Sequence, residues 1–574
     1  MLTSIRTTYI TRANLIQLAL IALVTLPVVI YVFKFSILYR NGIFGGEDWD
    51  YFAQSYEAAR ASILHYHQFP WWNAWSVGGA PLFANPQFGL FSIQTALVLL
   101  FGTVAGLHYA MMAYFVLGFW GMYLLLRRLG SKSRIISILL SYIWVFSSFN
   151  AWHLGGGHLS FAVYLLAPWA FLTLLNIHKR RGWIWFMLTT SLLIHTAPHY
   201  LTVETLAICG AIVAVQLYRY WRSHRGLAVR RYLPILKPYL LASIAILVLC
   251  GSKLLYTFQF THEYPRLTPL DAPVPPKLFI AALLFRHAVD PSALTAPYSQ
   301  PYGWAEYANY FGIVTLFLFV YLAIRKLESI KNMSTRDWLI LAATLIAAAL
   351  SLGAFWRFSP FNILHYMPIF NQMRVPSRFL CWFAFGVILF LGKLPRKPIV
   401  YVLLVISAID VFAANYGILN YPQRPYIQAQ KPDNTFQQYE FYKTDPALGQ
   451  IGILSIQDFR LLRATQMNQG EIYGYEPLLN IGEYYYLPGT TRCGVNKGCP
   501  FVITKNATVT RWSPHQIDLK RTGEGPIKVN MNPGKVWRVN GKKPFANDKI
   551  LELRKDFVID DPAQDIHIRY NPSL

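Results

Sequence analysis

The segment GGEDWDYFAQSYEAARASILHYHQFPWWNAWSVGGAPLFANPQ, residues 45–87, follows the first long apolar run of the chain, where a simple helical membrane bundle would have a short turn. It places three carboxylates, Glu47, Asp48 and Asp50, beside many aromatic residues, glycines and prolines. Long loops with this much chemistry are usually functional, and carboxylates next to a membrane helix are costly unless they are used. We interpret residues 36–104 as the active-site loop of a membrane enzyme.

Apolar runs of membrane-spanning length recur along most of the chain. Of the 574 residues, 54% are hydrophobic and 14% are charged, whereas a soluble protein carries about a quarter charged residues. The apolar runs continue from Asn14 to about Tyr416 and stop from Leu419 onward. The sequence therefore predicts a polytopic α-helical membrane domain, residues 1–418, followed by a soluble region, residues 419–574.

About eleven membrane spans are expected from these runs. They are Asn14–Phe35, Ala105–Arg127, Ile135–Phe149, Leu159–Leu175, Trp183–Thr196, Leu201–Leu217, Pro238–Tyr256, Tyr310–Ala323, Leu339–Leu350, Phe379–Leu391 and Pro398–Asn415. The further apolar segment Phe88–Leu100 is interpreted as an interfacial helix.

Positive charge in the connecting segments predicts the orientation. The basic connections are residues 127–134, 178–183, 218–232, 325–337 and 393–397. With eleven spans and a cytoplasmic N-terminus all of them lie in the cytoplasm, as basic loops usually do, whereas a twelfth span at Phe88–Leu100 would place them all outside. The C-terminal region is then outside the membrane. The net charge of +25 follows from the same rule and does not indicate a nucleic-acid partner.

The C-terminal region alternates short β-type runs with turn residues. The runs are PFVITKNATVTRWS, HQIDLKRT, PIKVNMN, KVWRVNGKKPF, KILELRKDFVI and QDIHIRY, and VNGKKP (539–544) resembles a turn between two strands. Period-two patterns broken by Gly, Pro and Asn are typical of antiparallel strands. We expect a β-rich, sandwich-like domain after a less regular α/β stretch.

Several polar groups are placed on the outer face by this topology. Arg374 and Arg378 stand four residues apart at an expected helix start and suit a phosphate, because guanidinium groups bind phosphate oxygens in pairs; they also suit lipid headgroups or snorkelling at the interface. Asp50 could remove a proton from an acceptor hydroxyl while the arginines stabilise a departing phosphate.

Other polar residues carry weaker signals. Acids of the loop, Asp48 and Asp50, together with His158, could hold a divalent cation such as Mg²⁺ or Mn²⁺. His153 and His158 flank a glycine triplet, in a spacing that matches no known metal site. Glu204 lies in an apolar helix, where a carboxylate indicates function or a buried pair.

Two of the five cysteines, Cys493 and Cys499, lie in the C-terminal region. Outside the cytoplasm they can form a local disulfide, and in the cytoplasm they would be free thiols. The sequence leaves both alternatives open.

Three motifs together resemble one known family. Asp50 and Gln54 precede a run that contains Trp72, Asn73, Gly79 and Ala84-Asn85-Pro86-Gln87; FNQMRVPSRF carries the two arginines; and KVWRVNGKKP begins a strand pair that ends in IHIRYNP. These motifs are similar to those of the bacterial YfhO-like family, which is grouped with GT-C-type glycosyltransferases. His153 and His158 stand where many GT-C enzymes have a second acidic motif.

The resemblance implies a GT-C-like membrane bundle of the bacterial inner membrane and a polyprenyl-phosphate-linked sugar as donor. Asp50 or Asp48 would then be the acidic residue of the first outer loop, with Glu47 beside them, and the residues Arg374, Arg378, Gln54, Trp72, Asn73, His153, His158 and Glu204 would bind substrate. The acceptor would be a glycan, a lipid or a cell-envelope polymer. The alternative is a protein without enzymatic activity, a lipid-glycan transporter or an assembly protein that docks envelope partners. The acid cluster favours the enzyme, because a headgroup transporter has little use for carboxylates at its mouth.

Overall fold

The computed structural model describes the chain in segments that fall into two compact units. The described residues are 25–34, 43–44, 48–76, 78–223, 233–263, 273–295, 302–328, 333–367, 369–420, 424–425, 436–439, 460–471, 498–499, 501–502, 504–529, 531, 536–542 and 557–571. Unit 1 consists of Met1–Leu38, Ala110–Gly251 and Leu267–Pro422, and unit 2 of Tyr39–Tyr109, Ser252–Arg266 and Gln423–Leu574. The loop that the sequence analysis assigned to the membrane domain thus belongs to the same unit as the C-terminal region.

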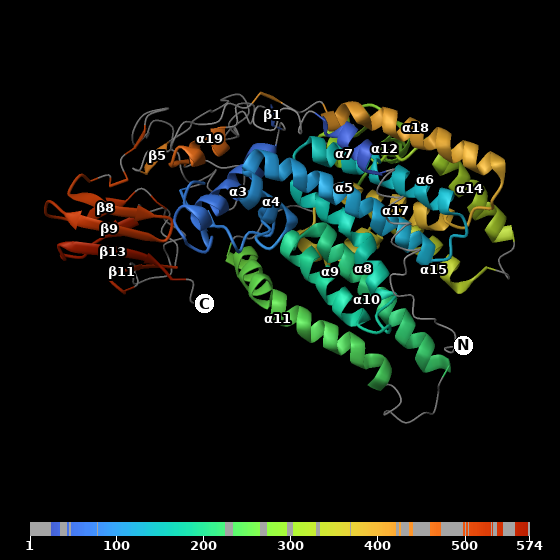
Figure 1. The fold of residues 1–574 in the computed structure, drawn as a ribbon, viewed down its shortest axis with the longest axis horizontal. Helices are drawn as coiled ribbons and strands as arrows, with labels where there is room; N and C mark the ends of the chain where they lie inside the picture. Colours follow the sequence, from blue (N-terminus) through green and yellow to red (C-terminus); the bar gives the residue numbers. More distant parts are fainter. Residues whose placement is uncertain are drawn as a thin grey trace. The chain divides into compact units, whose positions relative to one another are not determined.

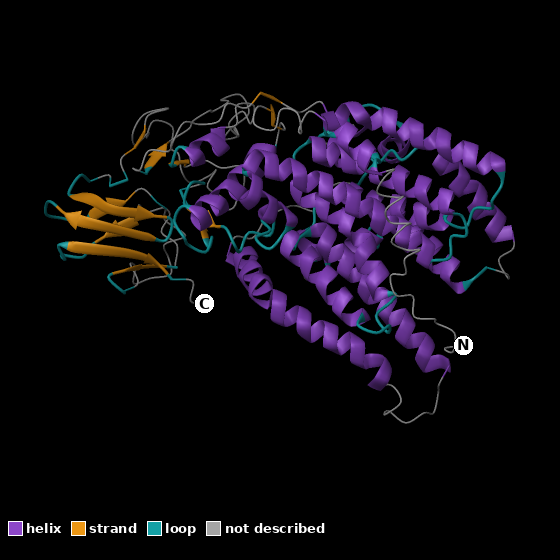
Figure 2. Ribbon diagram, viewed as in Figure 1, coloured by secondary structure: helices purple, strands orange, loops and turns teal. Residues whose placement is uncertain are grey.

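Helices build almost all of unit 1 (Figures 1 and 2). They are α6 (Arg134–Val145), α7 (Ser148–Gly155), η1 (Leu159–Leu166), α8 (Ala167–Leu174), α9 (Gly182–Thr196), α10 (Tyr200–Ser223), α12 (Pro276–Leu284), α13 (Ser292–Thr295), η3 (Trp304–Glu306), α14 (Ile313–Glu328), α15 (Thr335–Ser351), α16 (Pro360–His365), η5 (Phe370–Gln372), η6 (Pro376–Phe379), α17 (Leu380–Leu391) and α18 (Pro398–Asn420). Two more, α5 (Thr103–Arg128) and α11 (Leu233–Glu263), run from one unit into the other.

Each predicted span from Ala105–Arg127 onward coincides with a helix or a pair of consecutive helices. Among the described residues, five helical segments are long and apolar enough to cross a membrane: Thr103–Arg128, Arg134–Gly155, Tyr200–Ser223, Leu233–His262 and Pro398–Leu419. The helical membrane-type fold is therefore confirmed, and the number of eleven spans and their orientation stay predictions. The first predicted span is described only over residues 25–34, which are mostly helical.

Local sequence signals explain where the helices begin. The Ser334 hydroxyl accepts the N–H of Asp337 at 3.2 Å before α15, and a side-chain oxygen at this position satisfies a donor that the first helical turn leaves unpaired. In the core, α15 packs against α17, whose apolar residues are almost all buried. The two helices approach so closely at Gly386 that an added Cβ would meet the Thr344 hydroxyl at 2.1 Å.

Unit 2 contains two short helices at its start, α3 (Trp49–Leu64) and α4 (Ile93–Phe101), and several small sheets. The helix α4 covers only part of the expected interfacial helix Phe88–Leu100, because the hydroxyl of Ser92 caps its start. Short strand pairs are β1 (Ile43–Phe44) with β4 (Arg424–Pro425), and β2 (Trp72–Asn73) with β3 (Ala80–Pro81). A further three-stranded sheet joins β5 (Gln437–Tyr439) to β6 (Gln469–Glu471) and β7 (Gly498–Cys499), next to the helix α19 (Arg460–Gln466).

The largest sheet of unit 2 has the strand order β11-β13-β9-β8, and all its pairs are antiparallel. Its strands are β8 (Ala507–Ser513), β9 (Gln516–Arg521), β11 (Trp537–Val539) and β13 (Asp565–Tyr570), and β10 (Ile527–Val529) pairs separately with β12 (Phe557–Ile559). All six runs of the sequence analysis therefore contain a strand, and the β-rich C-terminal region is confirmed (Figure 2).

The register of this sheet follows from the alternation of apolar residues. Ile517 lies opposite Ile568, and Leu519 lies opposite Ile566, and all four side chains are buried. A shift by one residue would turn these side chains to the other face. The predicted turn is also present: Asn540 and Gly541, both with positive φ, connect Val539 to Lys542, as a two-residue hairpin loop requires.

Candidate functional site

The carboxylate of Asp50 joins the aromatic loop to the C-terminal region within unit 2. It lies in the first turn of α3 and accepts the backbone N–H groups of Leu461 at 3.1 Å and Leu462 at 2.9 Å, at the start of α19. Asp50 is 2% exposed. Burial raises the pKa of its carboxyl to about 7, against the opposing effect of the two N–H groups. Both oxygens therefore already serve to hold α19, as in a helix N-cap.

The two other acids predicted to be catalytic are Asp48 and Glu47. Asp48 precedes α3 as its N-cap residue, is 7% exposed, and makes no capping hydrogen bond with its side chain. Glu47 lies outside the described residues. Asp48 is thus a second buried carboxylate at the start of the same helix.

Gln54 and Asn73, both predicted to bind substrate, bind each other. Asn73 Nδ2 donates to Gln54 Oε1 at 3.0 Å, and Gln54 Nε2 donates to Asn73 Oδ1 at 3.3 Å. Asn73 Oδ1 also accepts the N–H of Trp75 at 3.1 Å. Both amides are buried, so their pairing satisfies groups that would otherwise be costly to bury. In this structure the two residues hold α3 to β2.

Lys253 holds the Ala84-Asn85-Pro86-Gln87 turn. Its ammonium donates to the carbonyl oxygens of Phe83 at 2.6 Å, Asn85 at 2.8 Å and Phe88 at 3.0 Å, and the side chain is 1% exposed. The Asn85 amide adds a bond to the hydroxyl of Tyr51 at 3.0 Å. Lys253 was not among the residues predicted to be functional, although a lysine within an apolar run by itself indicates a special role.

Trp72 lies against the β-strands of unit 2. Its backbone N–H donates to Nε2 of His515 at 3.3 Å, and its ring meets that of Trp537 edge-on at 5.6 Å. Burial lowers the pKa of His515 to about 4, so the ring is neutral and can accept this bond. Gly79 packs on the other side of the indole: it has φ +103°, and an added Cβ would lie 2.5 Å from Trp72 Nε1. Only glycine fits this position.

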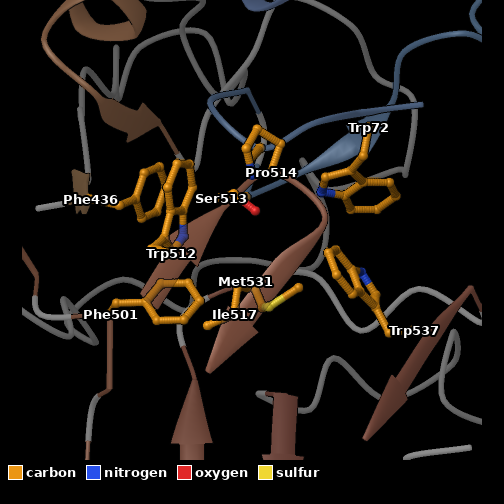
Figure 3. Close-up of a pocket in the computed structure, with 11 residues that line it drawn as sticks. Trp72, Phe436, Phe501, Trp512, Ser513, Pro514, Ile517, Met531 and Trp537 are labelled. Atoms are coloured by element: carbon orange, nitrogen blue, oxygen red, sulfur yellow. The ribbon is translucent and has the colours of Figure 1, made fainter. Parts of the chain in front are cut away.

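Trp72 and Trp537 are also part of a small aromatic pocket, shown in Figure 3. The other aromatic side chains of its wall are Phe436, Phe501 and Trp512. Of these residues only Trp72 was expected to bind substrate, because its partners come from segments far away in the chain.

In unit 1, Arg378 forms a buried ion pair with Glu306. Its Nε donates to Glu306 Oε2 at 2.7 Å and its Nη2 to Oε1 at 2.5 Å, and the guanidinium lies 4.9 Å from the ring centres of Phe161 and Tyr200. Burial opposes ionisation of Glu306, but the guanidinium outweighs it and holds the pKa of Glu306 below its usual range. Arg378 thus already has a carboxylate as its partner.

Arg374 is placed differently. Its guanidinium lies 5.7 Å from the ring centre of Tyr302, and its buried Nε has no hydrogen-bond partner among the described residues. The next residue, Val375, has φ +66°, which is strained for a β-branched side chain. The two arginines therefore have different partners. Arg378 forms an internal ion pair, whereas the Nε–H of Arg374 donates to no described residue.

The rings of His153 and His158, five residues apart in the sequence, are in contact. Their Nδ1 atoms are 2.6 Å apart, so one ring donates to the other, and His153 stacks on Phe161 at 4.5 Å between ring centres. Together with Asn150 and Phe149 they line a small hollow in unit 1.

Glu204, predicted to be functional or paired, is buried in α10. Its carboxylate accepts the indole N–H of Trp382 at 2.5 Å. The indole from α17 thus gives the buried carboxylate a hydrogen-bond donor.

A cation site is a poor fit for the described carboxylates. Among the described residues no three His, Cys, Asp or Glu side chains gather in a metal-binding arrangement. Both oxygens of Asp50 already accept backbone N–H groups. The divalent cation expected on Asp48, Asp50 or His158 stays a prediction, and no step below depends on it. The expected Cys493–Cys499 disulfide involves Cys493, which lies outside the described residues.

No known protein family matches the sequence, and no curated protein matches it. The chain is similar in structure to an arabinofuranosyltransferase, AftD from Mycobacteria, with 16% identity and a TM-score of 0.46, over 79% of this chain and 31% of that chain. It is also similar to an oligosaccharyltransferase of Archaeoglobus fulgidus, with 13% identity and a TM-score of 0.44, over 81% of this chain and 65% of that chain. For ArnT from Cupriavidus metallidurans, bound to undecaprenyl phosphate, the identity is 11% and the TM-score 0.33, over 83% and 88% of the two chains.

The chain thus spans about a third of the length of AftD and about two thirds of that of the oligosaccharyltransferase. At these identities and TM-scores the likenesses carry no argument about the chemistry of this chain. The YfhO-like resemblance and the GT-C grouping stay predictions.

Proposed function

We propose that this protein is a membrane glycosyltransferase that moves a sugar from a polyprenyl-phosphate donor to a glycan, lipid or cell-envelope acceptor outside the cytoplasm, in the inner membrane of a bacterium. The observation that carries the proposal is the acidic start of α3, where Asp48 and Asp50 are both buried in a unit rich in aromatic side chains. Buried carboxylates are expensive to keep and indicate a use.

The two acids have different roles in this proposal. Asp50 holds α19 through both of its oxygens, so it positions the loop. Asp48 is buried at the start of the same helix, and we assign it the chemistry. It accepts the proton of the acceptor hydroxyl as that oxygen attacks the anomeric carbon. The bond from this carbon to the donor phosphate breaks, the phosphate leaves with the electron pair, and the anomeric carbon is inverted.

For unit 1 taken by itself, the proposal names a phosphate-binding arginine. Arg374 offers a buried Nε without a partner, whereas the guanidinium of Arg378 is already bound on two sides by Glu306. A guanidinium can hold a phosphate through two parallel hydrogen bonds. Arg378 therefore supports the local fold, and Arg374 is the arginine for the phosphate.

The test is transfer of radiolabelled sugar from a panel of polyprenyl-phosphate sugars by the purified full chain in lipid nanodiscs. Asp48→Asn should lower kcat about a hundredfold or more, and Asp50→Asn should lower the stability of the fold. Arg374→Ala should raise the KM for the donor. Its matched control is Arg357→Ala, because Arg357 also lies over an aromatic ring, that of Phe358 at 5.5 Å.

A folded wild-type protein that transfers sugar from no donor would refute the proposal, as would normal transfer by Asp48→Asn. Either result would favour a non-enzymatic lipid-glycan transporter or an envelope docking protein.

A further inference from the structure

In unit 1, the chain between α15 and α17 exposes many large apolar side chains. Within residues 355–369, the apolar segment, six of them are between 53% and 86% exposed: Trp356, Phe358, Ile363, Tyr366, Met367 and Ile369. Single exposed apolar side chains are normal on a protein surface, whereas a group of them marks a site that contacts a membrane or another protein.

Polar groups and a buried ring hold the apolar segment in a defined conformation. The Asn362 amide donates to the carbonyl oxygen of Trp356 at 2.8 Å, and His365 Nε2 donates to the carbonyl oxygen of Met373 at 2.6 Å. On the opposite side from the exposed residues, the ring of Phe361 is 0% exposed. The fold therefore anchors this segment on one side and presents its apolar side chains on the other.

The chemistry of the apolar segment favours a lipid surface over a protein partner. Its one formally charged side chain is Arg357, and residues 351–378 contain no Asp or Glu. The guanidinium of Arg357 lies 5.5 Å from the ring centre of Phe358, which in turn meets the ring of Trp356 edge-on at 5.3 Å. Aromatic rings are enriched at the level of lipid headgroups, and an arginine there buries its stem and extends its charge toward the phosphates.

The segment also continues a face of the fold that is suited to lipid. The helix α15 contains the predicted span Leu339–Leu350 and exposes Leu345 by 55% and Ile346 by 57%. It ends at Ser351, shortly before the apolar segment begins, and the next predicted span starts at Phe379. The apolar segment thus joins the ends of two predicted spans, where the surface of the bilayer would lie.

We propose that the apolar segment lies in the headgroup region of the lipid bilayer. Its aromatic and aliphatic side chains contact the upper parts of the acyl chains, and Arg357 contacts lipid phosphates. The segment is then a membrane-contacting surface and not a loop in water. This inference goes beyond the proposed function, because lipid contact at this surface requires no sugar transfer.

The first test uses the full chain in lipid nanodiscs with a photoreactive side chain in the variant Tyr366→benzoylphenylalanine. Illumination should join position 366, which is 86% exposed, to a phospholipid, and mass spectrometry detects the lipid on the peptide. The same substitution at Phe317, 69% exposed in α14, is the control for lipid contact, and at Val509, 40% exposed in β8, the control for a position in water. The yield at 366 should approach that at 317 and exceed that at 509 about tenfold, because an interfacial side chain is surrounded by lipid.

A second measurement gives the depth of Trp356 without a photoreactive group. The fluorescence of Trp356 is the difference between wild type and Trp356→Phe. Lipids brominated near the headgroups should quench it more than lipids brominated at the chain ends, because interfacial side chains lie about 5–10 Å into the boundary between headgroups and acyl chains. The matched control is Trp144→Phe, because Trp144 is 1% exposed and its fluorescence should be little affected by either lipid.

A lipid yield at position 366 no higher than at 509 would overturn the proposal. Attachment of position 366 to a protein in place of lipid, in nanodiscs or in native membranes, would overturn it in favour of a protein-docking surface. Fluorescence of Trp356 that brominated lipids leave unchanged would overturn it as well. Neither measurement involves sugar transfer, so its outcome is separate from that of the transfer assay.

Discussion

Replacing Lys253 by methionine keeps the length and the apolar stem of the side chain but removes three N–H donors. These donors hold the carbonyl oxygens of Phe83, Asn85 and Phe88. No ion-pair partner of this ammonium is found among the described residues. Its burial is compensated by the three carbonyl oxygens and by the ring of Phe83, whose centre lies 5.3 Å from Nζ. We expect Lys253→Met to release the turn that contains Asn85.

The expected cost follows from these three bonds. Hydrogen bonds to a charged group each contribute about 1.5–3 kcal/mol, and a buried carbonyl left without a partner costs about 1–3 kcal/mol. Asn85 O keeps the N–H of Phe88 at 3.2 Å, so the loss falls mainly on the carbonyls of Phe83 and Phe88. The variant also no longer buries an ammonium, which returns several kcal/mol. This return offsets the lost bonds to the charge, so what remains is the cost of the two unpaired carbonyls, about 3 kcal/mol in all.

Hydrogen exchange followed by mass spectrometry measures this effect locally, on residues 78–92 of the full chain in nanodiscs. A loss of about 3 kcal/mol should speed exchange there about a hundredfold. The matched control is Lys393→Met, because Lys393 donates to a single carbonyl, that of Leu129 at 2.7 Å. Exchange in residues 78–92 that is no faster in Lys253→Met than in the control would refute the reasoning.

Three further predictions concern other parts of the molecule. Gly79→Ala should destabilise unit 2 by more than about 1 kcal/mol, because φ is +103° and the new Cβ would lie 2.5 Å from an indole, whereas Gly210→Ala, where nothing lies within 4 Å, should be neutral or stabilising in thermal unfolding. Arg378→Met should lower the free energy of unfolding by about 3–5 kcal/mol, because it leaves Glu306 buried and unpaired. The double variant with Glu306→Gln should recover part of this loss. Equal losses in the single and the double variant would contradict the ion-pair argument. Burial raises the pKa of Asp50 to about 7, so the neutral carboxyl stabilises the fold at low pH and this contribution is lost as pH rises. Between about pH 5 and about pH 8 the free energy of unfolding of wild type should fall by about 3 kcal/mol more than that of Asp50→Asn. Equal pH dependence of the two free energies would contradict this prediction.

Patterns with a short period were predictable from the sequence. Alternating apolar residues located the strands that contain Ile517, Leu519, Ile566 and Ile568, because each inward position follows two residues after the last. Long apolar runs located the helices of unit 1. The start of α15 is likewise a local feature, because its cap, Ser334, lies three residues from the N–H that it accepts.

The roles of the motif residues were not predictable in the same way. The sequence marked Gln54 and Asn73 as substrate-binding, but in the structure they bind each other. It marked Arg374 and Arg378 as equivalent, but Glu306 pairs with only one of them. A side chain that is chemically suited to a ligand is equally suited to an internal partner, and the sequence does not say which of the two is nearby.

The sequence by itself therefore determined the class of each segment: membrane helices, an acidic aromatic loop and a β-rich C-terminal region. The tertiary structure decided what each polar group does, because those decisions depend on contacts between residues far apart in the chain. Asp50 meets the N–H of Leu461, 411 residues away, and Trp72 meets His515, 443 residues away. Hydrophobic periodicity acts over a few residues and fixes which face of an element is buried, whereas hydrogen bonds and ion pairs over such separations exist only once the chain has folded.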